Sequence, residues 1–240
     1  TATFTRVSAS LNSQDNDVRD VKFNTNGTKM FMLGRANDSV YEYTLATAWD
    51  VATLTYVDAL DISVVDSTTG DNAANSIEFN TDGTKLFVLG QGQDLVNEYA
   101  LSTGFDVSTA SFTQSFDISS QESLPYGLAF NNDGTKMFIT GNDKDGNPQS
   151  IHEYTLDNPF VITSGVTHVI EVQPDPQPDH VDGIVFNYDG TKMYITDSVA
   201  NEIRQFELTT AFSIATLSLQ GTLDLSTYGI EGGRETVFSS

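Results

Sequence analysis

Short apolar runs alternate with polar turns along the whole chain, and the alternation repeats with a long period. Each unit opens with a run that ends on Phe, continues through Asn, a variable residue, Asn or Asp and Gly-Thr-Lys, and then enters a second apolar run. A third run carries Glu-Tyr or a variant of it, and a fourth precedes the next unit. Four runs of strand length in each unit predict four β-strands per unit.

The predicted strands occupy equivalent places in the four units. The first strands are 21–23, 76–79, 127–130 and 183–186, and the second are 29–33, 85–89, 136–140 and 192–196. The third strands are 40–45, 96–101, 151–156 and 203–208, and the fourth are 53–62, 110–118, 167–172 and 216–225.

The Phe that ends each first strand gives the period of the repeat. These anchors are Phe23, Phe79, Phe130 and Phe186, and Phe238 begins a partial fifth copy. They are spaced by 56, 51, 56 and 52 residues. A period near 50 in a strand-rich chain is typical of a β-propeller. We therefore predict an all-β fold: one β-propeller domain, residues 1–240, of four-stranded antiparallel blades, with four full repeats and a partial fifth formed by the termini.

The connection between the first and second strands has a clear turn chemistry. Asn, then Asn or Asp, then Gly suit a type I turn followed by a left-handed residue, and Gly adopts a positive φ at little cost. We expect this conformation at the motif glycines, which are Gly27, Gly83, Gly134 and Gly190. One glycine per copy with no helix after it does not make a phosphate-binding loop.

The second strand is apolar on both faces, as in Met30-Phe31-Met32-Leu33. A strand with one wet face should alternate, whereas a strand covered on both sides need not. Stacked propeller blades cover their inner strands twice, so this pattern favours a propeller over a simple sandwich. An aromatic residue also recurs between the third and fourth strands, and we interpret it as a core plug: Trp49, Phe105, Phe160 and Phe212.

The run Asp-Gly-Thr-Lys-Met-Phe followed by Glu-Tyr resembles the YVTN-type and lactonase-like propeller repeats. It is also similar to repeats of marine bacterial surface proteins and phage-associated proteins, whose second half matches Phe105-Asp106-Val107-Ser108-Thr109-Ala110-Ser111-Phe112. The resemblance covers nearly the whole chain and implies an extracellular or virion-associated propeller module. Since propellers host unrelated activities, it does not imply one function.

Residues 1–10 resemble a fourth strand, because Ala2-Thr3-Phe4-Thr5 matches Ala110-Ser111-Phe112-Thr113. With the partial copy at Phe238, the chain would hold a fourth and a first strand of a fifth unit without its two middle strands. We expect either a fragment of a longer array, an incomplete fifth blade, or strands that pair with a neighbouring subunit.

The composition is globular but strongly acidic. Eleven Lys and Arg against 33 Asp and Glu give a net charge of −22. Four of the cations belong to the repeat motif, so no basic patch remains for nucleic acid or an anionic membrane. The chain has no Cys, which excludes disulfides and thiolate chemistry. No apolar stretch approaches the length of a membrane span, and no signal peptide is visible.

Acidic residues gather just before the first strands, where propeller loops share one face near the axis. Carboxylates are the ligands that hard cations prefer, so this axial rim is a candidate Ca²⁺ site or polyol-binding mouth, and a solvated ring of loops is the alternative. The candidate rim ligands are Asp17, Asp71, Glu122, Asp179 and Asp182. Asp143 and Asp145 begin a calcium-loop pattern that lacks its bidentate Glu, which makes a plain turn the favoured interpretation.

Little in the sequence indicates catalysis. Among the three His residues, only His180, between Asp179 and Asp182, falls on the predicted axial face. No Ser/His/Asp set has recognisable spacing.

We therefore expect no enzyme and no catalytic residue, but a non-catalytic structural or adhesive module on a cell surface, filament or phage tail. Its partners would be further copies of itself, joined through the terminal strands, or a surface glycan, with no nucleic acid and no membrane insertion. The alternatives are a glycan-binding propeller lectin, with Tyr188 among its candidate aromatics, and a metal-dependent lactonase-like hydrolase.

Overall fold

A computed structural model describes residues 10–63, 73–142 and 148–229. The strands of these residues form four antiparallel sheets, which we call blades 1 to 4. Blade 1 contains β1 (Val18–Phe23), β2 (Lys29–Gly34), β3 (Ser39–Leu45) and β4 (Leu54–Asp61). Blade 2 contains β5 (Ala74–Phe79), β6 (Lys85–Gly90), β7 (Leu95–Leu101) and β8 (Ala110–Asp117). Blade 3 contains β9 (Pro125–Phe130), β10 (Lys136–Gly141), β11 (Ser150–Leu156) and β12 (Val166–Val172). Blade 4 contains β13 (Ile184–Phe186), β14 (Lys192–Asp197), β15 (Glu202–Leu208) and β16 (Leu217–Asp224).

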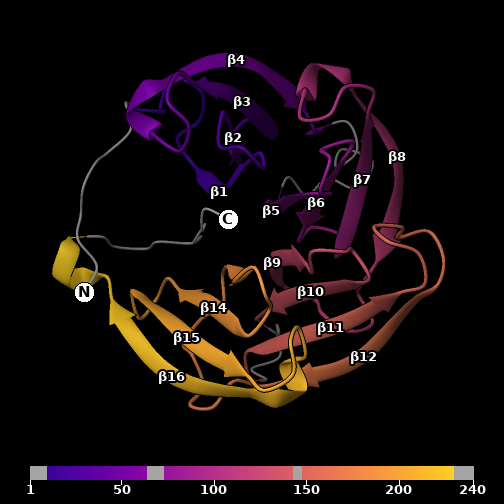
Figure 1. The fold of residues 1–240 in the computed structure, drawn as a ribbon, viewed down its shortest axis with the longest axis vertical. Helices are drawn as coiled ribbons and strands as arrows, with labels where there is room; N and C mark the ends of the chain where they lie inside the picture. The colour runs from indigo at the N-terminus through magenta and orange to yellow at the C-terminus, as the bar shows by residue number, and fades with distance from the viewer. Residues whose placement is uncertain (1–9, 64–72, 143–147, 230–240) are drawn as a thin grey trace.

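The four blades are arranged around a common axis as a β-propeller (Figure 1). The first strand of each blade is nearest the axis and the fourth is outermost. This confirms the predicted fold class, and each anchor Phe ends an inner strand. In Figure 1 the ring of described strands is open between blade 4 and blade 1. The predicted partial fifth unit, including Phe238, lies outside the described residues.

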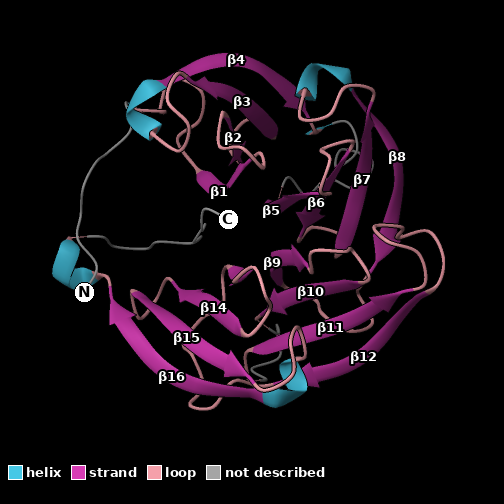
Figure 2. Ribbon diagram, viewed as in Figure 1, coloured by secondary structure: helices cyan, strands magenta, loops and turns pink. Residues whose placement is uncertain are grey.

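The described residues contain four single turns of 3-10 helix, shown in cyan in Figure 2. They are η1 (Val51–Thr53), η2 (Val107–Thr109), η3 (Ile214–Thr216) and η4 (Ser226–Tyr228). The first three begin the outer strands of blades 1, 2 and 4. Within the described ranges, no helix has the length and apolarity needed to cross a membrane.

The turn between the two innermost strands has the predicted conformation in all four blades, with the motif glycines at φ between 68° and 73°. In blade 3, Asn131 Oδ1 accepts a hydrogen bond from the Lys136 N–H at 2.9 Å, and Asp133 Oδ1 accepts one from Thr135 N–H at 3.0 Å. The Thr135 hydroxyl donates to the same Asp133 oxygen at 2.6 Å, and this bond, followed by the one from the Thr135 N–H, lowers the pKa of Asp133. The motif therefore fixes the hairpin through its own side chains.

The recurring aromatic plug packs on this turn. In blade 3 the Phe160 N–H bonds to the Gly134 carbonyl at 2.9 Å, and a Cβ added at Gly134 would lie 2.2 Å from the Phe160 ring. The four plugs adopt positive φ values of 52° to 65°, and each is half-buried. They therefore close the end of the core, as predicted, and the motif glycine leaves the space that they fill.

The core lies between blades, and the second strand is its centre. Met30, Phe31, Met32 and Leu33 of β2 are at most 3% exposed, which confirms that this strand is covered on both faces. The central Phe of β2, β6 and β10 contacts the anchor Phe of the following blade with ring centroids 4.6–4.7 Å apart. Burial of these apolar faces holds the blades together.

A lysine and a glutamate repeat a polar contact across each junction between described blades. Lys136 Nζ donates to Glu153 Oε1 at 2.6 Å and to the Phe212 carbonyl of blade 4 at 2.7 Å. Glu153 Oε2 accepts from the Ile214 N–H, also in blade 4, at 3.1 Å. Lys29 and Lys85 make the same contact to the carbonyls of the next plugs, each at 2.6 Å. The motif lysine thus ties one blade to the next.

Blade 4 has no following blade among the described residues, and its outer face differs accordingly. Gln205 stands where the other blades have Glu, and Lys192 is exposed. Ile203 is half-buried, whereas Val40, Val96 and Ile151 at the equivalent position are fully buried. Ile203 and Gln205, together with Tyr194 and Leu223, line a groove of about 360 Å³. We call this surface the open face of blade 4.

Candidate functional site

Five buried carboxylates surround the axis at the end where the inner strands begin. Three of them lie just before an inner strand, one lies in the first half of β1, and one ends β14. All are at most 3% exposed: Asp15, Glu122, Asp182, Asp20 and Asp197. We call this set the inner rim. A buried carboxylate requires hydrogen-bond donors or a cation, so its partners indicate what it does.

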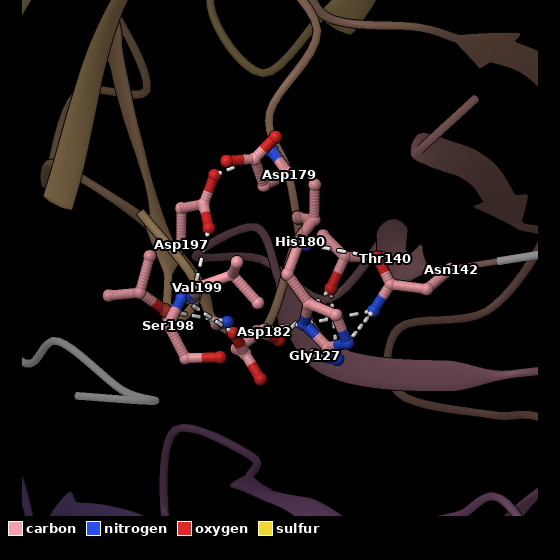
Figure 3. A network of polar contacts seen from close by, with 12 residues as sticks. Gly127, Thr140, Asn142, Asp179, His180, Asp182, Asp197, Ser198 and Val199 are labelled. Carbon is pink, nitrogen blue, oxygen red and sulfur yellow. Dashed lines mark hydrogen bonds and ion pairs between the residues drawn. The ribbon is translucent and has the colours of Figure 1, made fainter. Parts of the chain in front are cut away.

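In blade 4 the inner rim organises two loops (Figure 3). Asp197 Oδ2 accepts from the Asp179 N–H at 2.7 Å, while Oδ1 accepts from Val199 at 3.1 Å and Ala200 at 2.9 Å. The Arg204 guanidinium lies 3.7 Å from the same carboxylate. Backbone donors therefore occupy both oxygens of Asp197.

His180 lies beside the inner rim, and Figure 3 shows it between Asp182 and Asn142. Its Nδ1 lies 3.0 Å from Asp182 Oδ2, and its ring meets Tyr126 edge-on with centroids 4.6 Å apart. Burial raises the pKa of Asp182, but hydrogen bonds from His180 and Ser198 outweigh it, so the pKa is lowered overall. Asp182 is therefore an ionised acceptor that orients the imidazole.

Asn142 is the second hydrogen-bonding partner of the His180 imidazole. Its Oδ1 accepts from the Val181 N–H at 3.0 Å, which leaves its Nδ2 facing the His180 ring, 2.8 Å from Nε2 and 3.0 Å from Nδ1. If Nδ1–H donates to Asp182, Nε2 is the ring nitrogen left to accept from the amide. A general base needs that lone pair for a substrate proton. In this arrangement, His180 instead bridges blade 3 and blade 4.

The backbone of the two blades comes unusually close beneath this bridge. Thr140 Oγ1 accepts from the Gly127 N–H at 2.9 Å and donates to the Asp182 carbonyl at 3.2 Å. A Cβ at Gly127 would lie 2.6 Å from that carbonyl oxygen. Glycine is therefore required for this approach of the blades.

The remaining carboxylates of the inner rim also accept hydrogen bonds from backbone N–H groups or a hydroxyl. Asp15 accepts from the N–H groups of Asp17 at 2.7 Å and Asn37 at 2.9 Å. Glu122 Oε1 accepts from the next two N–H groups at 2.8 Å and 2.7 Å. Asp20 Oδ2 reaches into blade 2, where it accepts from Ser76 Oγ at 2.8 Å and Ile77 N–H at 2.7 Å. The inner rim therefore stiffens loops and joins neighbouring blades.

The structure separates the predicted metal ligands. Glu122 and Asp182 belong to the inner rim, whereas Asp179 is exposed and Asp17 pairs with Arg19 at 2.7 Å. Within residues 10–63, 73–142 and 148–229, no group of three His, Cys, Asp or Glu side chains is placed to hold a metal. Asp71, Asp143 and Asp145 lie outside the described residues. The Ca²⁺ site stays a prediction.

Two polar groups escaped the sequence analysis. Asp197 occupies the place where the second strands of the other three blades end in Gly, and that departure was the available signal. His152, buried in β11, lies with Nδ1 3.2 Å from Nε2 of His168 on β12. Burial, followed by the neighbouring His152, lowers the pKa of His168. Pairing of β11 with β12 brings the two histidines together.

Comparison with solved structures identifies propellers of the same architecture. A periplasmic gluconolactonase of Pseudomonas aeruginosa matches with a TM-score of 0.51 at 14% identity, over 87% of this chain and 54% of that chain. A protein from Lactobacillus plantarum matches with a TM-score of 0.54 at 13% identity, over 91% and 57% of the respective chains. The β-propeller domain of Swd1 from Myceliophteria thermophila matches with a TM-score of 0.50 at 13% identity, over 91% and 61%.

The likeness is one of fold. Structural matches at identities of 14% or less show that the architecture is shared, and they say nothing about activity. The chain spans a little over half the length of the gluconolactonase and of the Lactobacillus protein. No protein-family model matches the sequence, and the search of curated proteins finds no match.

Proposed function

We propose that this chain is a non-catalytic structural and adhesive propeller module that works outside the cell, on a surface appendage, a filament or a phage tail apparatus. The observation that carries the proposal is the open face of blade 4. It presents, without a described partner blade, the positions that join the other blades to one another. A surface of this kind suits assembly.

The partner we propose is a second copy, stacked head to tail. Blade 1 carries the groups that the open face requires, because its Trp49 carbonyl and Val51 N–H correspond to the Phe212 carbonyl and Ile214 N–H of blade 4. Lys192 would donate to the first, as Lys136 does to Phe212. Gln205 would accept from the second through its amide oxygen.

Cross-linking tests this assembly cleanly, because the chain has no Cys. With Lys192→Cys and Asp50→Cys in one chain, a short bismaleimide should link separate chains into dimers and longer ladders. Lys136→Cys with Ser213→Cys is the matched control, since it samples the equivalent junction inside one chain. Absence of links between chains, while the control pair reacts within the chain, would refute the assembly.

A lactonase-like hydrolase is the second candidate function. The His180–Asp182 pair and the likeness to a gluconolactonase favour it. The amide of Asn142 at the His180 Nε2 opposes it. We therefore expect gluconolactone hydrolysis at the uncatalysed rate, measured by a pH-indicator assay with and without added divalent cations.

His180→Asn and Asp182→Asn serve as comparisons in that assay, and Asp224→Asn on the outer strand controls for changed surface charge. Equal rates for all four proteins and for buffer are the expected result. A wild-type rate above buffer that both rim variants abolish would replace our proposal with the hydrolase.

Bound Ca²⁺ would stiffen the loops of an extracellular module, and the acidity of the chain supports this part of the proposal. We expect millimolar Ca²⁺ to raise the Tm relative to chelator, because an ion that binds only the folded state stabilises it. Calorimetry in both conditions, with Mg²⁺ as the control ion, measures the effect. An unchanged Tm would exclude the calcium site.

A further inference from the structure

The mouth of the ring opposite the inner rim contains a pocket of about 490 Å³. Asp182 of the inner rim precedes β13 and Tyr188 of the pocket follows it, so the two sites lie at opposite ends of this inner strand. Each blade contributes the variable residue of its Phe-Asn-x motif to the wall: Thr25, Thr81, Asn132 and Tyr188. One motif position thus forms a shared site that the sequence alone does not show.

Contacts between blades hold this wall in shape. Thr81 Oγ1 of blade 2 donates to the Asn132 carbonyl of blade 3 at 3.3 Å, and Asn132 Nδ2 donates to the Tyr188 carbonyl of blade 4. Three adjacent turns are therefore connected, so a ligand would meet a largely preformed surface. Preformed sites lose less conformational entropy on binding.

The pocket combines a polar wall with aromatic surface. Tyr188 is 77% exposed and lines the opening. Phe79, Phe130 and Phe160 supply apolar surface. The hydroxyls of Thr25 and Thr81 supply donors and acceptors beside them.

A carboxylate in the pocket, Glu78, is paired with a lysine. Glu78 Oε1 accepts from the Phe79 N–H at 3.1 Å, and Oε2 lies 3.4 Å from Lys22 Nζ. About a quarter of the Glu78 side chain is exposed, at 24%. Lys22 Nζ also lies 3.7 Å from Asp20 Oδ1, so it offsets part of the Glu78 charge and weakens the attraction for a cationic ligand, while the net charge of −22 disfavours an anion. A neutral ligand rich in hydroxyl groups fits this balance.

We propose that this pocket binds a neutral saccharide, with the Tyr188 ring against the C–H face of one sugar unit and Glu78, Thr81 and Asn132 bonding its hydroxyls. An aromatic ring offers a flat apolar face, and a carboxylate and an amide oxygen accept from hydroxyls. The inference rests on the proposed function, because it names the ligand class of the adhesive surface. The volume holds one or two sugar rings.

A glycan array of neutral, acidic and amino sugars tests the proposal on the full chain, and titration calorimetry with the best neutral sugar follows. We expect binding of a neutral mono- or disaccharide that Tyr188→Ala weakens at least tenfold and Glu78→Gln also weakens. Tyr56→Ala is the matched control, because Tyr56 is an exposed tyrosine on outer strand β4. It should bind as the wild type does.

Thermal melts of each variant check folding, and Tyr188 is exposed enough for its removal to leave the fold intact. The proposal is overturned if no neutral sugar binds, if only charged sugars bind, or if Tyr188→Ala binds like Tyr56→Ala. Such a failure leaves the lactone and cross-linking results untouched, because neither assay uses this pocket. Failure of the proposed function would appear in those assays instead.

Discussion

We expect Glu153→Ala to lower the free energy of unfolding by about 3 kcal/mol. The substitution breaks the buried ion pair with Lys136 and removes the acceptor of the Ile214 N–H. Glu153 is 3% exposed, and its loss leaves the buried Ile214 N–H without a partner. Lys136 keeps a quarter of its side chain in water, which limits the cost to the lower end of the range for such pairs. For a chain of this length, Tm falls by roughly 6–12 °C.

Chemical denaturation and calorimetry measure this effect, and the chain supplies its own controls. Gln205→Ala alters the equivalent position in blade 4 and should cost less than about 0.5 kcal/mol. Glu98→Ala should fall between the two, because the second oxygen of Glu98 accepts from the side chain of Gln114 and not from a backbone N–H of blade 3. If Glu153→Ala and Gln205→Ala proved equally mild, the Lys–Glu contact would have no role in joining blades.

Replacement of Gly134 by Ala is the second large expected effect. Gly134 has φ at 71°, where a Cβ costs about 1–2 kcal/mol. The new Cβ would also lie 2.2 Å from the Phe160 ring, and such overpacking costs about 1–3 kcal/mol. We expect a loss of about 3 kcal/mol in urea unfolding.

Two other glycines separate these causes. Gly229 also has φ at 71° but has no heavy atom of the described residues within 4 Å of a Cβ, so Gly229→Ala reports the backbone cost alone. Gly221 has no described heavy atom within 4 Å of a Cβ and no positive φ, so Gly221→Ala should be nearly neutral. In a Phe160→Ala background, the cost of Gly134→Ala should fall to that of Gly229→Ala. Equal costs in both backgrounds would show that the plug does not press on the turn.

The local chemistry of the repeat was readable because its partners are neighbours in sequence. Asn131, Asp133 and Gly134 form their turn within six residues, so the motif itself specifies the hairpin and the positive φ. The unbroken apolar character of β2 likewise predicted burial on both faces, since solvent on either side would penalise it. Period, blade architecture and turn conformation therefore followed from the chain alone.

The site could not be read in that way, because its contacts join residues far apart in the chain. Lys136 and the Phe212 carbonyl are 76 residues apart, and Asn142 and His180 are 38 apart. The sequence placed His180 beside Asp182 on the axial face, but only the fold placed the amide of Asn142 at its Nε2. Likewise, the pocket exists because ring geometry brings together one variable position from each of four turns.

The sequence by itself determined that this protein is built from four-stranded repeats with fixed turns and doubly covered second strands, because hydrogen bonds and apolar periodicity within each unit are local. Tertiary structure alone decided which carboxylates bond to backbone donors, which lysines bridge blades and which face lacks a following blade among the described residues. Those outcomes depend on how the blades approach one another, and no short stretch of the chain encodes that approach.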